Sequence, residues 1–233
     1  MIPFIPLQER IIYEDNHLLV LNKLPSEIVQ RDKSGDTALL EQLKNLIKKR
    51  DHKPGRVFLE VIHRIDRPVS GLVMFAKTSK GLSAFNTLLR NRKIKKTYLA
   101  IVQNPPPKEI DTLEHYLIRN TQTNKSKALT TEIRNSKKAL LSYTILAKSD
   151  RYYLLHIHLI TGRHHQIRAQ LAAINCPIKG DIKYGYPRTN PGGFIHLHSY
   201  QLEFEHPIKK QILQLSCKPS FQDTLWEYFF TKL

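Results

Sequence analysis

The sequence predicts an α+β fold, in which helices pack on a mixed, largely antiparallel sheet. Alternating apolar segments typical of half-buried strands outnumber segments with helical spacing. These strands follow one another in pairs interrupted by single helices, whereas a parallel sheet alternates strand and helix regularly. A chain of 233 residues with 41% hydrophobic residues can bury a sizeable core. No Gly/Ser-rich or Pro-rich linker divides it, so we expect residues 1–233 to form a single domain of catalytic size.

Period-two alternation predicts seven strands along the chain, at residues 17–23, 56–62, 71–77, 97–103, 139–148, 152–160 and 195–205. Helical spacing predicts helices at 37–50, with Asp36 as the candidate cap, and at 80–92, opened by Ser79. Two further helices are expected at 164–175 and 221–230. Residues 104–138 contain loops rich in Pro, Asn, Thr and Lys around one strand, TLEHYLIR. This segment is either an RNA-facing excursion or a mobile surface hairpin.

The charge balance points to a polyanionic partner. The chain carries 37 Lys and Arg against 20 Asp and Glu, a formal net charge of +17. A single basic run is usually a solvated face, but an excess of this size over a whole chain favours nucleic acid. A membrane surface is the competing partner; the Lys-rich stretch at 44–53 is broken by Asp51, and no apolar run approaches the ~20 residues of a membrane span.

Cysteine usage and the N-terminal residues bear on the compartment. Only Cys176 and Cys217 occur, which excludes a disulfide framework and a cysteine-based zinc site and predicts two core thiols. The N-terminus MIPFIPLQERIIYED has prolines and acids where a signal peptide needs a basic start and an apolar run. We therefore expect a cytoplasmic protein.

One carboxylate stands out for its isolation. Between Glu60 and Glu109 the only acid is Asp66, and ten Lys and Arg residues share that stretch. Nearby positive charge keeps a carboxylate ionised well below neutral pH, so Asp66 is unsuited to act as a general acid. Three roles remain: a structural ion pair at a turn, a metal ligand, or a nucleophile or general base. A magnesium site is disfavoured because no second acid is close in sequence.

The residues around Asp66 carry a family resemblance. The segment His63-Arg64-Ile65-Asp66-Arg67 with Ser70-Gly71 resembles the HRLDR-x-x-SG signature of RNA pseudouridine synthases of the RluA type, which convert uridine to pseudouridine within RNA. Four further motifs are similar to those of the family: YEDNHLLVLNK at 13–23, KKTYLAIV at 95–102, TGRHHQIRAQLAAINCPIKGDIKYG at 161–185 and HLHSYQLEFEHP at 196–207. Together they span roughly residues 10–220, so the resemblance covers most of the chain.

The resemblance implies a role for four residues. Asp66 takes the position of the catalytic aspartate, and Tyr98 that of the tyrosine which packs against uracil and is proposed to take the proton from carbon 5. Arg168 falls where a basic residue pairs with the catalytic aspartate. Arg64 stands where relatives insert a side chain into the space left by the flipped nucleotide. Without the resemblance, Tyr98 reads as a packed aromatic, Arg168 as a surface or phosphate-binding residue, and Arg64 as a phosphate contact.

The implied reaction is an isomerisation, so no metal, nucleotide or redox cofactor is expected. Whether Asp66 attacks the sugar or the ring, or removes a ribose proton, stays open. His156 with His158, and His196 with His198, lie at i, i+2 spacing, but no HExxH motif or cysteine partner accompanies them. His164 stands where the family usually has Thr, so a precise substrate contact at this position is in doubt. Lys23-Leu24-Pro25-Ser26 departs from the commoner Lys-Pro-Ala-Gly, so the shape of this turn is in doubt as well.

The expected partner is a stem-loop of ribosomal or transfer RNA. Because the first motif begins near residue 10, we expect no small RNA-binding module before the catalytic domain. Phosphate contacts are then expected from residues 93–96, 104–138 and 44–53. No heptad pattern suggests an obligate dimer, so a monomer is expected. The alternative function is a non-catalytic RNA-binding or ribosome-assembly protein on the same scaffold; a metal-dependent hydrolase lacks its carboxylate cluster.

Overall fold

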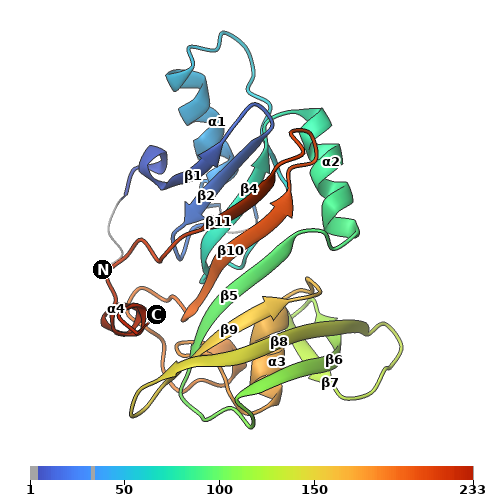
Figure 1. Cartoon of the computed structure of the whole chain (residues 1–233), viewed down its shortest axis with the longest axis vertical. Helices are drawn as coiled ribbons and strands as arrows, with labels where there is room; N and C mark the ends of the chain where they lie inside the picture. The colour runs from blue at the N-terminus through green and yellow to red at the C-terminus, as the bar shows by residue number, and fades with distance from the viewer. Residues whose placement is uncertain (1–4, 33–34, 233) are drawn as a thin grey trace. The chain divides into compact units, whose positions relative to one another are not determined.

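The computed structural model describes residues 5–32 and 35–232. Residues 1–4, which belong to the N-terminal stretch that was compared above with a signal peptide, lie outside this range. The chain divides into two compact units: residues 1–94 with 199–222, and residues 95–198 with 223–233. Figure 1 shows the elements of both units. The expectation of a single domain stays a prediction, and each unit is described by itself.

The first unit is built on a sheet with the strand order β1-β2-β4-β10, and β11 pairs with β10 and β3 with β4. Its strands are β1 (Ile11–Glu14), β2 (Leu18–Lys23), β3 (Glu60–Val61), β4 (Ser70–Ala76), β10 (Leu197–Glu205) and β11 (Ile212–Ser216). Strands β1 and β2, β2 and β4, β3 and β4, and β10 and β11 pair antiparallel. A short 3-10 helix, η1 (Leu7–Arg10), precedes the sheet, and two helices complete the unit, α1 (Leu39–Arg50) and α2 (Ser79–Arg90).

Alternation along β2 and β4 explains why both strands are buried throughout. Leu18, Val20, Leu72 and Met74 belong to one apolar cluster, which includes Phe85 of α2. The alternate residues of the two strands belong to a second cluster: Leu19, Leu21, Val73 and Phe75. This cluster includes the buried side chains Leu39, Leu43 and Ile47 of α1. Successive side chains of a strand point to opposite faces, so each helix covers one face of this sheet.

The second unit contains a five-stranded antiparallel sheet with the order β5-β9-β8-β6-β7. Its strands are β5 (Lys95–Val102), β6 (Ile110–Asn120), β7 (Lys125–Leu129), β8 (Lys137–Lys148) and β9 (Tyr153–Leu159). Helix α3 (Gln166–Ala173) packs on one face, where Ala169 shares a cluster with Leu117 and Ala139. The 3-10 helix η2 (Ile182–Tyr184) and helix α4 (Thr224–Phe230) complete the unit.

The α+β class with antiparallel pairing is confirmed, and the expected elements are present with several corrections. The strand expected at 56–62 shrinks to Glu60–Val61, and Phe58 is 43% exposed. Helix α1 begins at Leu39 behind Ala38, and the carboxylate of Asp36 pairs instead with Arg67 at 2.6 Å.

Three further details of the sequence interpretation are settled by the structure. Thr78, not Ser79, caps α2, since its Oγ1 accepts a hydrogen bond from the Gly81 amide. The segment 104–138 contains two strands, β6 and β7, where one was expected. Both cysteines are buried, as predicted for core thiols. No helix among the described residues is long and apolar enough to cross a membrane.

Candidate active site

The segment that carries Asp66 is a loop between β3 and β4 of the first unit. The Val69 amide donates to the carbonyl of Asp66 at 3.0 Å, which closes a tight turn through Arg67 and Pro68. Asp66 is half-buried in this turn, whereas Arg64 and Arg67 are exposed. Ile65 packs against the apolar cluster beneath α1. The loop is therefore anchored by one apolar side chain and presents its charged residues at the surface.

The buried amine of Lys23 binds the backbone of this loop. Lys23, at the end of β2, is fully buried, and its Nζ donates to three backbone carbonyls: Leu24 at 2.8 Å, Glu27 at 2.9 Å and Arg67 at 3.0 Å. The Ser26 amide also donates to the Arg67 carbonyl at 2.9 Å. The turn at residues 24–27, which follows the motif at 13–23, and the turn of the Asp66 loop are thus joined through one ammonium group, whose buried donors are satisfied.

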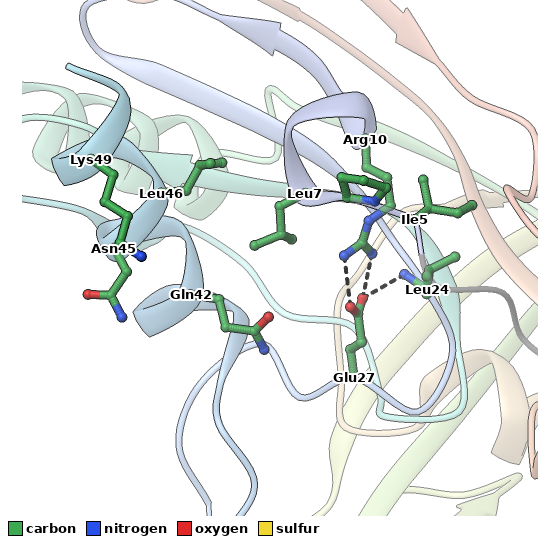
Figure 2. A pocket seen from close by; sticks show the side chains of 10 residues that line it. Ile5, Leu7, Arg10, Leu24, Glu27, Gln42, Asn45, Leu46 and Lys49 are labelled. Carbon is green, nitrogen blue, oxygen red and sulfur yellow. Dashed lines mark hydrogen bonds and ion pairs between the residues drawn. The ribbon is translucent and has the colours of Figure 1, made fainter.

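The charge of Lys23 is linked to that of Asp66. Burial lowers the pKa of Lys23 to about 7, while the carboxylates of Glu27 and Asp66 raise it. Glu27 is itself held by Arg10, whose Nη1 and Nη2 donate to its two oxygens at 2.8 and 2.9 Å. Figure 2 shows this pair and the Leu24 amide, which donates to the same carboxylate. Lys23 and the turn at residues 24–27 therefore support the Asp66 loop through a connected set of hydrogen bonds.

The Ser70-Gly71 end of the motif is explained by close backbone packing. Gly71 has φ of +110°, and a Cβ there would lie 2.6 Å from the Ser199 amide nitrogen and closer still to the Ser199 carbonyl oxygen. Only glycine fits such a contact. Gly71 is the second residue of β4, five residues after Asp66, so this contact fixes the end of the loop that leads into β4.

Tyr98 and Arg168, expected beside Asp66, belong to the second unit. Tyr98 lies on β5 opposite Ile157 of β9 and is 6% exposed. Arg168 lies on α3 and is 5% exposed. Its Nε and Nη2 donate to the two carboxylate oxygens of Asp181 at 2.7 and 2.8 Å. This bidentate pair fixes the plane of the guanidinium. The pairing of Arg168 with Asp66, and the contact of Tyr98 with uracil, stay predictions.

The loop before α3 is fixed by its own side chains. Oε1 of Gln166 accepts from the Thr161 hydroxyl at 2.8 Å and from the Arg163 amide at 3.0 Å, and Nε2 donates to the Leu140 carbonyl at 3.0 Å. His165 adopts a left-handed conformation with φ of +52°. Its ring stacks on that of His164, with centroids 3.8 Å apart. These bonds set the start of α3 and therefore the position of Arg168.

Of the histidines at i, i+2 spacing, His196 has structural partners on both ring nitrogens. His196 is fully buried; its Nε2 lies 3.0 Å from Asp223 and its Nδ1 lies 3.1 Å from Asn190. His156 and His158 lie on β9, and burial lowers the pKa of His156. Among the described residues, no group of three or more His, Cys, Asp or Glu side chains could hold a metal ion.

A known protein family matches the part of the chain that contains these candidate site residues. The model of the RNA pseudouridylate synthase family matches residues 17–173, a span that holds Lys23, Asp66, Tyr98 and Arg168. The chain belongs to this family. The match covers more than half of the chain and runs through parts of both units.

Two relatives of the synthase family show the extent of the similarity. A "Ribosomal large subunit pseudouridine synthase C" of Buchnera aphidicola (subspecies Baizongia pistaciae) is 33% identical over 211 residues, covering 86% of this chain and 64% of the relative. The protein of the same name from Haemophilus influenzae is 30% identical over 226 residues, covering 93% and 67%. The chain thus spans about two thirds of the length of these relatives.

Solved structures support the synthase fold. "Human RNA Pseudouridylate Synthase Domain Containing 4" superposes with a TM-score of 0.78 at 23% identity, covering 97% of this chain and 94% of that one. "Human RNA Pseudouridylate Synthase Domain Containing 1" superposes with a TM-score of 0.71 at 22% identity, covering 92% and 85%.

Several residues that contact the candidate site residues or their loops were not assigned a role from sequence. Lys23 is part of the motif at 13–23, and Asp181 and Tyr184 are part of the GD…YG block, yet their partners were not assigned. Lys23 binds backbone carbonyls, which leave no trace in sequence. Asp181 carried a signal that was available: it is the only acid between Asp150 and Glu203, and Arg168 lies 13 residues before it.

Proposed function

We propose that this chain isomerises uridine to pseudouridine in structured RNA, with Asp66 as the catalytic carboxylate. The observation that carries the proposal is the placement of Asp66. It lies in a tight turn whose backbone is held by the buried Lys23 ammonium, inside the region that matches the family model. A pre-organised loop of this kind is what a carboxylate needs in order to act on one atom of a bound nucleotide.

The proposed reaction is balanced without an added reagent. The bond between ribose carbon 1′ and uracil nitrogen 1 breaks, the uracil turns, and a bond forms to carbon 5. Carbon 5 loses a proton and nitrogen 1 gains one. Asp66 acts on the ribose or the ring, Tyr98 is the proposed acceptor of the carbon 5 proton, and Arg168 orients the carboxylate. Arg64, exposed on the Asp66 loop, is the side chain proposed to fill the space of the flipped nucleotide.

The proposed substrate is a ribosomal or transfer RNA stem-loop. The names of the relatives favour large-subunit ribosomal RNA, and the net charge of +17 fits a polyanion. Exposed cations in residues 93–96, namely Lys93 and Lys95, in residues 104–138 and in residues 44–53 at the end of α1 supply the proposed phosphate contacts. A monomer acting in the cytoplasm remains our expectation.

The experiment is pseudouridine mapping of ribosomal and transfer RNA from cells with and without the gene, complemented by wild type or by Asp66→Asn. The expected result is a site that disappears with the gene and returns only with wild type. In vitro, Asp66→Asn should bind RNA within about a few-fold of wild type, because the substitution adds no bulk.

The competing function is a non-catalytic RNA-binding or ribosome-assembly protein. It predicts an unchanged map, and a ribosome-assembly defect that Asp66→Asn complements as well as wild type does. Restoration of the modified site by Asp66→Asn would instead refute Asp66 as the catalytic residue.

A further inference from the structure

Tyr184 takes no part in the proposed reaction, but its buried hydroxyl contacts two other segments of the second unit. It ends η2 of the second unit and is 6% exposed. Its hydroxyl accepts a hydrogen bond from the Ser126 amide of β7 at 2.8 Å and lies 2.9 Å from Nδ1 of His165. The phenol therefore touches both the β6–β7 hairpin and the residue before α3.

Both hydrogen-bonding functions of this phenol are used. Burial, together with the nearby charge of Arg168, lowers the pKa of His165 to about 2, so the ring is neutral at physiological pH. In the Nε2–H tautomer, Nδ1 of His165 accepts the phenol proton while the phenol oxygen accepts from Ser126. The chain of bonds from Ser126 to His165 thus has one consistent direction.

The ring of Tyr184 reaches Arg168 by a second route. The guanidinium carbon of Arg168 lies 5.0 Å from the ring centroid, within the range of a cation–π contact. Asp181 binds the edge of the same guanidinium. The carboxylate thus binds the edge of the Arg168 guanidinium and the Tyr184 ring contacts its face.

The hairpin on the other side of Tyr184 is strongly basic. Between Glu114 and Glu132 the sequence has no acid, but it has Arg119, Lys125 and Lys127. Arg119 donates to the side chain of Asn124 at 3.0 Å, and Lys183, two residues after Asp181, donates to the Asn124 carbonyl at 3.3 Å. These cations gather where β6 turns into β7, and such a group favours RNA phosphates.

We propose that Tyr184 is a positioning residue that couples the β6–β7 hairpin to Arg168. Contact of the hairpin with RNA phosphates fixes the position of Ser126, which fixes the Tyr184 hydroxyl. The Tyr184 ring then restrains the Arg168 guanidinium, which aligns the carboxylate of Asp66. The proposal rests on the proposed function in one respect, namely that Arg168 serves pseudouridine formation.

The test is a double-mutant cycle between Tyr184→Phe and Arg168→Lys, read as single-turnover rates at saturating RNA. Tyr184→Phe keeps the ring and loses only the hydroxyl link. We expect about a tenfold lower rate with RNA affinity within about twofold of wild type, and less than about a twofold effect of Tyr184→Phe when Arg168 is already Lys. Tyr186→Phe is the matched control, because it removes a hydroxyl bonded to Gln103 in the same segment.

A second readout does not depend on activity. The Nε proton of Arg168, assigned by its loss in Arg168→Lys, is followed by NMR hydrogen exchange. We expect exchange about tenfold faster in Tyr184→Phe and unchanged in Tyr186→Phe. Equal rate losses in both Arg168 backgrounds, or unchanged exchange, would overturn the coupling. If wild type forms no pseudouridine in RNA, the proposed function fails, and the exchange rates still decide whether Tyr184 holds Arg168.

Discussion

The Lys23 ammonium donates a 3.0 Å hydrogen bond to the backbone carbonyl of Arg67, the residue that follows Asp66. Lys23 ends a strand of the first motif, and Arg67 lies 44 residues further along the chain. This bond and those to Leu24 and Glu27 turn two loops into one rigid unit. The geometry of the candidate catalytic loop therefore depends on a residue outside its own motif.

Replacing Lys23 by Met should destabilise the protein and abolish activity. The substitution keeps the volume but leaves three carbonyls without their common donor, a loss of about 2–4 kcal/mol in the free energy of unfolding. Urea unfolding measures the effect. Lys44→Met is the control, because Lys44 makes only 3.8 Å contacts with acids on partly exposed side chains. Equal stability of the two variants would show that the three bonds are not needed.

The stability contributed by Lys23 should depend on pH with a defined sign. Burial lowers its pKa from 10.5 to about 7 in the folded protein, so between these values the unfolded chain holds more protons. Stability from this group therefore rises with pH across that window and is flat below it. The unfolding free energy of wild type minus that of Lys23→Met should grow by about 2 kcal/mol from about pH 7.5 to about pH 9. A constant or falling difference would contradict the lowered pKa.

The sequence predicted the strands that are buried on both faces closely, and it missed the short, largely exposed strand β7. Strands β2 and β4 agree with their expected ranges within one residue. A helix covers each face of the sheet, and every residue of both strands is buried. Strand β7 was not expected, because Lys125 and Lys127 point outward and only Ser126 is buried. The segment 56–62 shows the opposite error, since its alternation does not bury Phe58.

For the candidate site, sequence patterns indicated chemistry but not partners. Asp66 was found because it is the only acid in a basic stretch. Its support by Lys23 depends on main-chain carbonyls, and the pairing of Arg168 with Asp181 depends on how α3 meets η2. Such contacts are properties of the folded backbone, which local composition does not encode.

Adding one methyl group at Gly71 should be severely destabilising. A Cβ at this position collides with the Ser199 backbone, and φ of +110° disfavours any L side chain. We expect Gly71→Ala to lose about 3 kcal/mol or more in unfolding free energy. Gly55→Ala is the matched control, because a Cβ there meets no atom within 4 Å. Similar melting temperatures for the two variants would rule out the close packing of β4 at Ser199.

Arg168→Ala should be costly because it leaves the buried carboxylate of Asp181 without its partner. Asp181 is 1% exposed, and a buried ion pair that loses one member typically loses about 3–5 kcal/mol. The double variant Arg168→Met, Asp181→Leu should regain most of this stability, since it removes both charges. If the double variant is stable but inactive, Arg168 serves the reaction; if it is stable and active, the pair is only structural. Arg163→Ala, in the loop before α3, is the control.

Salt should weaken RNA binding steeply, and the β6–β7 hairpin should account for part of the slope. Each phosphate contact contributes about 0.7–0.9 to the slope of log affinity against log salt concentration. Lys125→Ala with Lys183→Ala should therefore reduce the slope by about 1.4–1.8 and weaken binding without regard to RNA sequence. Lys210→Ala with Lys232→Ala removes the same charge outside the proposed contacts, so its slope should equal that of wild type. Equal reductions in both pairs would mean that net charge, rather than the hairpin, attracts the RNA.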